Sequence, residues 1–231
     1  ARAANVKDAE AAWSTYGGVH ADLLKELGAT EFVGYERLSA DAEVCAIIRN
    51  GERVDSLSAG EQGEVVLNVT PFYAEMGGEV GDTGTITADG VELQVTDTKA
   101  PEKGLVCHVA TVASGVLTVG MAVSAQVDVK RRACIARNHT CTHILHAALR
   151  QVLGAHVKQA GSYVGPDRLR FDFTHFESVT PKQLKQVEEL ANSVIMSATA
   201  TNIFETSLAK AREEGVTALF GEKYGDVVRV V

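Results

Sequence analysis

The pattern of hydrophobic and polar positions changes twice along this chain of 231 residues. Residues 1–27 have helical spacing, which is interrupted at Gly17-Gly18 and ended by Gly28. We therefore expect residues 1–28 to form a helical connector from an upstream segment. Both chain ends are expected to lie inside a longer protein.

From residue 29 to residue 129 the chain consists of short apolar runs separated by turn signals such as Asn50-Gly51 and Asp89-Gly90. The predicted strands are residues 44–48, 64–69, 84–87, 92–95, 105–112 and 122–127. Many short strands joined by regular turns are typical of a small barrel or sandwich.

Residues 130–231 combine helices with strands. A long helix is predicted from Lys130 to Leu153 and ends at Gly154. Thr180-Pro181 starts a second helix, with Thr as the N-cap and Pro in the first helical position. The other predicted elements are strands at 156–164, 168–173 and 202–205, a helix at 207–214 and a closing hairpin at 217–231. This order predicts an α+β fold in two layers, with the long helix packed on a sheet.

The composition excludes several classes of protein. Hydrophobic residues make up 45% of the chain, so a sizeable core is expected rather than disorder. The formal net charge of −8 does not fit a protein that simply coats nucleic acid. Local positive clusters could still contact RNA, although solvated surface charge explains them equally well. These clusters are Lys130-Arg131-Arg132 with Arg137, and Lys158 with Arg168 and Arg170.

The four cysteines include no Cys-x-x-Cys pair, which predicts reduced thiols in a cytoplasmic protein. The sequence contains no signal peptide and no apolar run long enough to span a bilayer, so we expect no membrane association.

The segment with the most specific chemistry is the predicted helix around His139 and His143. At ~100° per residue, positions four apart lie on one helix face, where two imidazoles can share a metal ion, usually zinc. Cys141 should point away from this face, whereas Thr142 lies close to it. Ordinary helix histidines are the alternative interpretation, because two ligands are too few for a stable site.

A glycine-rich stretch covers residues 70–84 and includes Gly77 and Gly78. It lacks the Lys-Ser/Thr ending of a P-loop and the spacing of a dinucleotide-binding turn. Alone, it is explained better as a tight turn of the barrel.

Six short motifs follow one another along the chain: Phe72-Tyr73-Ala74-Glu75-x-Gly77-Gly78, Arg137-Asn138-His139-x-x-Thr142-His143, His146-Ala147-Ala148-Leu149-Arg150, Gln159-x-Gly161-Ser162, Leu169-Arg170-Phe171-Asp172-Phe173 and Ala218-Leu219-Phe220-Gly221-Glu222-Lys223-Tyr224. Together and in this order they resemble the editing region of the alanyl-tRNA synthetase family. The resemblance extends from about Thr30 to Val231. It implies a small antiparallel β-barrel at 29–129 and an α+β editing core at 130–231.

The resemblance also implies a zinc site. In that family zinc is held by His-x-x-x-His and a later Cys-x-x-x-His, which makes His139 and His143 two of the ligands. The second pair is expected after Val231, so we expect this chain alone to bind zinc weakly or not at all. Glu79 departs from the family, which more often has Gln at this position.

The implied activity is hydrolysis of the aminoacyl ester of Ser-tRNA(Ala) or Gly-tRNA(Ala), within a parent enzyme that is an ATP-dependent alanine–tRNA ligase. Thr142 is the candidate for recognising the serine hydroxyl, and Gln159 resembles a residue that lines the same pocket. The expected partners are tRNA(Ala) and an upstream aminoacylation domain of the same polypeptide. Candidate tRNA-binding residues are Gly77, Gly78, Glu79, Arg137, Lys158 and Arg170.

Two alternatives remain open at this stage. A standalone trans-editing deacylase would carry the Cys/His pair within its own chain. A non-catalytic tRNA-binding module would use the histidine helix only as a structural element.

Overall fold

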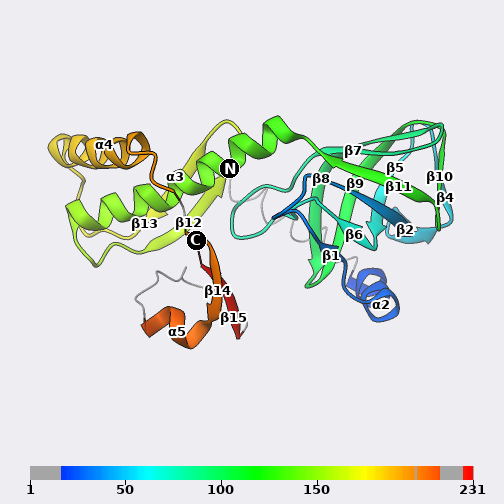
Figure 1. Cartoon of the computed structure of the whole chain (residues 1–231), viewed down its shortest axis with the longest axis horizontal. Coiled ribbons are helices and arrows are strands. Elements are labelled where there is room, and N and C mark those ends of the chain that lie inside the picture. The colour runs from blue at the N-terminus through cyan, green and yellow to red at the C-terminus, as the bar shows by residue number, and fades with distance from the viewer. Residues whose placement is uncertain (1–16, 201, 214–225, 231) are drawn as a thin grey trace. The chain divides into compact units, whose positions relative to one another are not determined.

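The computed structural model describes residues 17–200, 202–213 and 226–230. The helix predicted for residues 1–16 and the motif at residues 218–224 lie outside this part of the chain. The structure divides into two compact units, Ala1–Met76 with Val80–Ala133 and Gly77–Glu79 with Cys134–Val231 (Figure 1). The three-part division inferred from the sequence stays a prediction.

The first unit is built around a closed antiparallel barrel. Its strands are β2 (Ser39–Arg49), β5 (Gln62–Leu67), β7 (Gly84–Ala88), β8 (Val91–Glu102), β9 (Leu105–Ser114) and β11 (Ala122–Val127). The strand order is β11-β7-β8-β9-β5-β2, and pairing of β11 with β2 closes the sheet on itself. Each of the six predicted apolar runs overlaps one of these strands, so the predicted barrel is confirmed.

Four short strands of the barrel unit have no counterpart in the prediction: β1 (Glu31–Phe32), β3 (Glu52–Val54), β4 (Ser56–Ser58) and β10 (Val116–Thr118). A fifth, β6 (Val69–Thr70), shares only Val69 with the predicted strand at 64–69. β1 pairs in parallel with β6, and β4 pairs with β10. Strands of two or three residues are too short to show alternation in the sequence. The predicted turn at Asn50-Gly51 is present, with φ of 53° and 82°.

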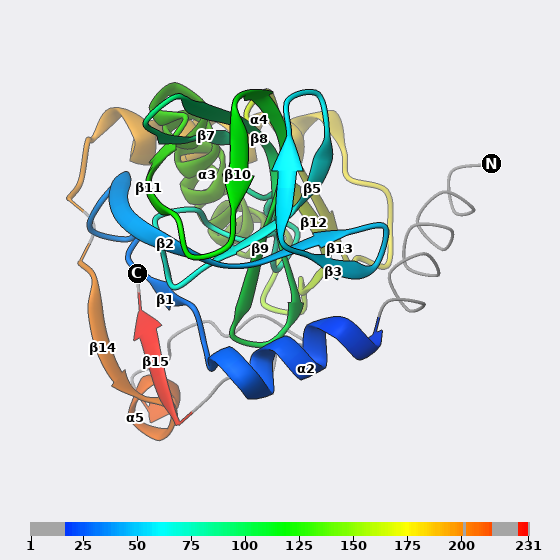
Figure 2. The ribbon, with the colours of Figure 1, turned by 90° about the vertical axis from the view of Figure 1, so that its right-hand side faces the viewer.

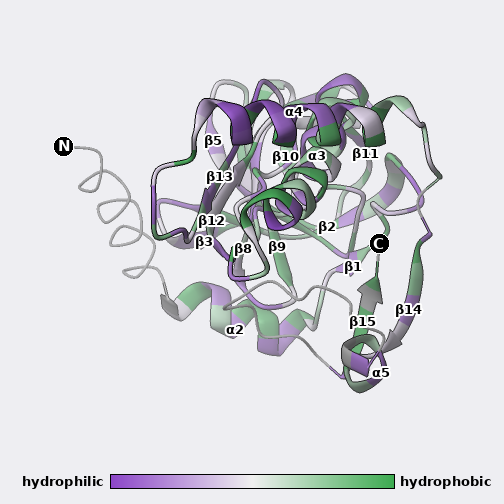
Figure 3. Ribbon diagram, turned by 90° about the vertical axis from the view of Figure 1, so that its left-hand side faces the viewer, coloured by the Kyte–Doolittle hydropathy of each residue, from purple (hydrophilic) through white to green (hydrophobic). Residues whose placement is uncertain are grey.

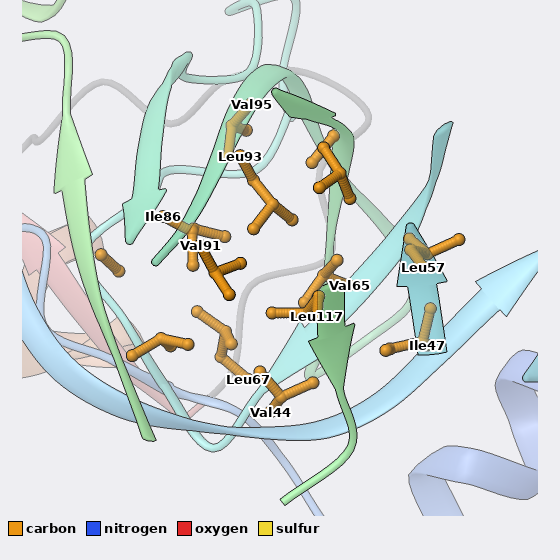
Figure 4. Packing of buried hydrophobic residues seen from close by; sticks show 14 of the residues in the cluster. Val44, Ile47, Leu57, Val65, Leu67, Ile86, Val91, Leu93, Val95 and Leu117 are labelled. Carbon is orange, nitrogen blue, oxygen red and sulfur yellow. The ribbon is translucent and has the colours of Figure 1, made fainter. Parts of the chain in front are cut away.

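The barrel interior is filled by side chains from alternate positions of each strand (Figure 4). On β5, Val65 and Leu67 point into this core. Glu64 and Val66, which alternate with them along the strand, therefore point outward. The alternation gives each strand an apolar inner face and a second, outer face.

Helix α2 (Gly17–Leu27) covers part of the outer face of the barrel (Figure 2). Its Leu23 is fully buried and packs with outward-facing barrel residues, which are Ala46, Ile48, Val66, Leu105 and Cys107. Gly17 and Gly18 are themselves helical in α2. The residues before Gly17 lie outside the described part of the chain, so the predicted interruption of the helical pattern stays a prediction.

The second unit contains the long helix α3 (Val129–Leu153), which begins in the first unit and continues past Cys134. It packs with α4 (Pro181–Met196) and the hairpin of β12 (Gln159–Val164) and β13 (Leu169–Phe173). Their shared core contains Ala148, Leu149, Val157 and Val187. Figure 3 shows α4 with a mostly hydrophilic outer side. The α+β character and the long helix agree with the prediction.

The capping of α4 is as predicted from Thr180-Pro181. The Thr180 side chain accepts from the Gln183 backbone, and the Gln183 side chain accepts from the Thr180 backbone. The strand predicted to begin at residue 156 begins instead at Gln159, because residues 155–156 form a turn.

A separate small sheet pairs β14 (Phe204–Ser207) with β15 (Val227–Val230), and α5 (Leu208–Glu213) follows β14. Most of the predicted closing hairpin lies outside the described residues. All four cysteines are free, as predicted. Among the described residues, no helix is both long and apolar enough to cross a membrane.

Candidate functional site

His139 and His143 lie next to each other on α3, with 5.0 Å between their ring centroids. The side chain of His139 is 47% exposed, so this histidine faces solvent rather than the core of the unit. Imidazoles one helical turn apart can ligate one ion from the same side of a helix.

Glu79 contacts the first histidine of this pair, His139. Its carboxylate is hydrogen-bonded to Nδ1 of His139, although the two residues are 60 positions apart. An ionised carboxylate only accepts hydrogen bonds, so Nδ1 carries the proton and Nε2 is the atom that would ligate a metal. A carboxylate behind a ligating histidine is the usual outer partner at zinc sites.

Two histidines on α3, His143 and His146, favour the neutral form. Burial lowers the pKa of His143 from its ordinary value, and the neighbouring His139 and His146 lower it further. Burial also lowers the pKa of His146, which is 7% exposed and whose Nε2 has no hydrogen-bond partner in the described structure. Neutral imidazole is the form that binds metals.

The segment Gly77–Glu79 is attached to β12. The backbone N–H of Val164 donates to the Gly78 carbonyl at 2.8 Å, and the Ser162 hydroxyl donates to the Gly77 carbonyl at 3.0 Å. Gly78 has φ of +87°, and a Cβ at this position would lie 2.5 Å from the Ser162 carbonyl oxygen. Only glycine fits both constraints, so these contacts fix the position from which Glu79 reaches His139.

Thr142 is 7% exposed, and its hydroxyl donates to the Asn138 carbonyl at 2.8 Å. This bond to the preceding helical turn is a common structural use of threonine. It also orients the hydroxyl oxygen, which keeps its capacity to accept a hydrogen bond from a ligand. The Asn138 amide in turn donates to the Gly165 carbonyl at 2.7 Å, which ties α3 to the end of β12.

Gln159 is the first residue of β12 and is partly exposed. It pairs with Phe173, and an irregularity in register follows between Gln159 and Gly161. Gln159 and the attachment of Gly78 at Val164 therefore lie at opposite ends of the same strand.

The candidate tRNA-binding cations differ in their surroundings. Arg137 and Lys158 are exposed, and the Arg137 guanidinium donates to Cys134 Sγ at 3.1 Å. Arg170 is exposed but pairs with Asp172, with an N–O distance of 3.0 Å. Within the first predicted cluster, Arg132 has a structural role instead, because it forms an ion pair with Asp82, whose side chain is 2% exposed.

Sequence reasoning gave no role to Asn138 or Ser162, although the motifs contain both. Their functions depend on partners from other elements, and spacing along the chain does not predict those partners. A separate hollow between α3 and α4 contains none of the candidate residues; it is lined by Gln151, Val152, Gln186, Glu189, Leu190 and Ser193.

Comparison with known proteins gives two kinds of match. Residues 1–131 match the family of tRNA synthetases class II (A). The chain is also 50% identical over 228 residues to an alanine–tRNA ligase of Nitrobacter winogradskyi, a match that covers 96% of this chain and 26% of that protein.

Two further relatives are similar. An alanine–tRNA ligase of Pelotomaculum thermopropionicum is 51% identical, with 90% of this chain and 24% of that protein covered. One of Acetivibrio thermocellus is 54% identical, with 87% of this chain and 23% of that protein covered. The chain thus spans about a quarter of the length of the curated relatives it matches.

Proposed function

The chain belongs to the alanyl-tRNA synthetase family, and on this premise we propose that it is the editing region, which hydrolyses the aminoacyl ester of Ser-tRNA(Ala) or Gly-tRNA(Ala). The observation that carries the proposal is the junction of three separate motifs. Gly77–Glu79, β12 and the histidine face of α3 meet, with Glu79 bonded to His139.

The chemistry of alanine selection requires such a site. A pocket that accepts alanine cannot exclude the smaller glycine, and an apolar pocket rejects an added hydroxyl by only ~10²-fold. A second site must therefore hydrolyse the wrong ester. Since serine is larger than alanine, size alone cannot spare alanine while admitting serine, so the second site must recognise the hydroxyl.

Thr142 is our candidate for this recognition. Its hydroxyl proton is held by the Asn138 carbonyl, so the oxygen can accept a hydrogen bond from the serine hydroxyl. Alanine and glycine offer no such donor. Gln159 is proposed as a further lining residue on the basis of the family resemblance alone.

The histidine face would hold the reacting end of the tRNA close to zinc. His139 and His143 would be two of the ligands, and Glu79 would keep His139 in the ligating tautomer. When bound, zinc would organise the pocket or polarise the ester, depending on whether its ligand shell is closed or open. The ester is already activated, so positioning a water near it supplies much of the rate.

We further propose that exposed backbone and cations of this unit contact tRNA(Ala). Gly77 and Gly78 are exposed next to Glu79, and Arg137 and Lys158 offer solvent-facing charges for phosphates. Arg170 would first have to release Asp172. Because the chain as a whole has a net charge of −8, attraction of the phosphate backbone would have to be local. The upstream aminoacylation domain of the same polypeptide would supply the mischarged tRNA.

The test is deacylation of purified Ser-tRNA(Ala) and Gly-tRNA(Ala) by the full-length parent protein. We expect hydrolysis of both, with Ala-tRNA(Ala) spared, and loss of hydrolysis in the His139→Ala variant. An editing rate that is unchanged in His139→Ala would contradict the proposed site. Binding of tRNA with no deacylation by the wild type would favour a non-catalytic tRNA-binding module.

A further inference from the structure

Three potential metal ligands converge on the outer face of the barrel, in the unit that does not contain the histidine pair. They are His20 on α2, Glu64 on β5 and Cys107 on β9, and their donor atoms all lie within 4.8 Å of one another. Nε2 of His20 lies 2.8 Å from a Glu64 carboxylate oxygen. Among the described residues, this is the only group of three such donors close enough to share an ion.

The strand register explains why these side chains meet. Val66 pairs with Cys107, and Glu64 lies two positions before Val66, so Glu64 and Cys107 share the outer face. The intervening Val65 points into the barrel core. Helix α2 covers this face (Figure 2). Its Leu23 packs against the outward-facing residues, and His20 is three positions earlier, on the same side of the helix.

The donor set has the chemistry of a zinc site. Imidazole nitrogen, carboxylate oxygen and cysteine sulfur are the three ligand types that zinc uses in proteins. A thiolate and a carboxylate together balance the charge of a divalent ion. His20 is 2% exposed and Cys107 is fully buried, while the Glu64 side chain is 21% exposed and leaves room for a water as fourth ligand.

We propose that His20, Glu64 and Cys107 form a binding site for a zinc-class divalent cation that is separate from His139 and His143. Tetrahedral ligands of zinc are about 3.5 Å apart, so donors within 4.8 Å need to move by only about an ångström. On binding, the ion takes the place of the His20–Glu64 hydrogen bond, and the Cys107 thiol releases its proton to solvent.

Such a site would join α2 to two barrel strands. The ion would therefore hold the helix on the outer face, as a structural metal does in small domains. The inference does not depend on the proposed editing activity. It changes one expectation from the sequence: the histidine pair is still expected to bind zinc weakly, whereas the chain as a whole is expected to retain an ion in the barrel unit.

The sequence does not predict this group, because its members are 44 and 43 residues apart and belong to no short spacing motif. Closure of the barrel and docking of α2 bring them together.

The experiment uses cobalt(II) as the probe. The protein is the full 231-residue chain with His139→Ala and His143→Ala, which remove the histidine pair, and it is treated with a chelator before cobalt is added. Cobalt bound to a thiolate gives a sulfur-to-metal charge-transfer band that nitrogen and oxygen ligands do not give. We expect this band to saturate at one cobalt per chain. Zinc should then remove it by competition. Absence of the band at excess cobalt would overturn the proposal.

Two cysteine variants assign the ligand. Cys45 packs against the same apolar cluster as Cys107 but lies outside the donor group, so Cys45→Ser should keep the band and Cys107→Ser should lose it. A band that survives in Cys107→Ser would overturn the assignment.

Because Cys107 is fully buried, Glu64→Gln provides an independent variant. It should fold, as judged by circular dichroism, and should weaken cobalt binding at least ~10-fold. Unchanged affinity in Glu64→Gln would contradict the site.

Discussion

His108 shows how a single buried polar residue can control stability. The residue is 0% exposed, its Nδ1 donates to the Val65 carbonyl at 2.8 Å, and its Nε2 accepts from the Thr70 hydroxyl at 2.7 Å. Both contacts are satisfied by neutral imidazole. Burial lowers the pKa of His108 to about 4.

This depressed pKa predicts a loss of stability in acid. Between about pH 6.5 and pH 4 the unfolded chain binds a proton at His108 and the folded chain does not, so unfolding becomes more favourable as the pH falls. The loss across this window should reach roughly 3 kcal/mol. Urea denaturation in EDTA at pH 7, 5.5 and 4.5 measures it. The His108→Gln variant should show a shallower dependence on pH, and an equal dependence in both proteins would contradict the assignment.

Thr142 is the residue on which substrate specificity depends in this account. Replacement by Val keeps the shape and removes the hydroxyl. In the full-length enzyme, Ser-tRNA(Ala) hydrolysis should slow by the equivalent of ~0.5–1.5 kcal/mol, while Gly-tRNA(Ala) hydrolysis should change little. Parallel deacylation rates for the two substrates measure this. An equal effect on both would mean that Thr142 only stabilises α3 through Asn138, and Gln159 would become the next candidate.

At the scale of elements, the segment Gly77–Glu79 depends on its contact with β12. Gly78→Ala would place a Cβ 2.5 Å from the Ser162 carbonyl oxygen at a φ of +87°. The segment should move, and the hydrogen bond between Glu79 and His139 should be lost. The rates of hydrolysis of Ser-tRNA(Ala) and Gly-tRNA(Ala) should therefore both fall. Deacylation rates of the full-length enzyme test this.

A matched control separates the contact from backbone strain. Gly90 also has a positive φ, of +69°, but nothing lies within 4 Å of a Cβ built there. Gly90→Ala should therefore leave deacylation near the wild-type rate, with only the modest cost of a left-handed residue, about 1–2 kcal/mol of stability. Equal loss of deacylation in the two variants would show that the clash with Ser162 is not the cause of the lost activity in Gly78→Ala.

The elements also show what sequence patterns can and cannot predict. Strands of the barrel were predictable because alternation and Gly turns are local signals, and the α4 cap was predictable from Thr180-Pro181. For the candidate editing site, the sequence predicted the separate motifs but not how they come together. The Glu79–His139 contact spans 60 residues. It depends on the hydrogen bonds that Val164 and Ser162 of β12 donate to the carbonyls of Gly78 and Gly77, which no local pattern encodes. The glycine pattern of residues 70–84 alone therefore predicts a tight turn of the barrel and does not predict the contact with His139.

At the scale of the whole molecule, we expect the chain to fold without metal. Among the described residues, the barrel core alone contains sixteen buried hydrophobic residues, which is far more than a zinc finger can bury. Circular dichroism during heating in EDTA should give a cooperative transition. A gradual loss of signal, without a cooperative transition, would mean that one of the metal sites is required for folding.

The central claim is that this chain edits tRNA rather than only binding it. The most direct measurement compares two activities in two forms of the full-length parent enzyme. These forms are the wild type and a double variant that carries both His139→Ala and His143→Ala. One activity is alanylation of tRNA(Ala), and the other is deacylation of Ser-tRNA(Ala). We predict that the double variant keeps alanylation and loses deacylation, because we propose that the histidine face belongs to an editing site apart from amino-acid activation. Retained deacylation in the double variant, or a parallel loss of both activities in a variant that still folds, would contradict the account.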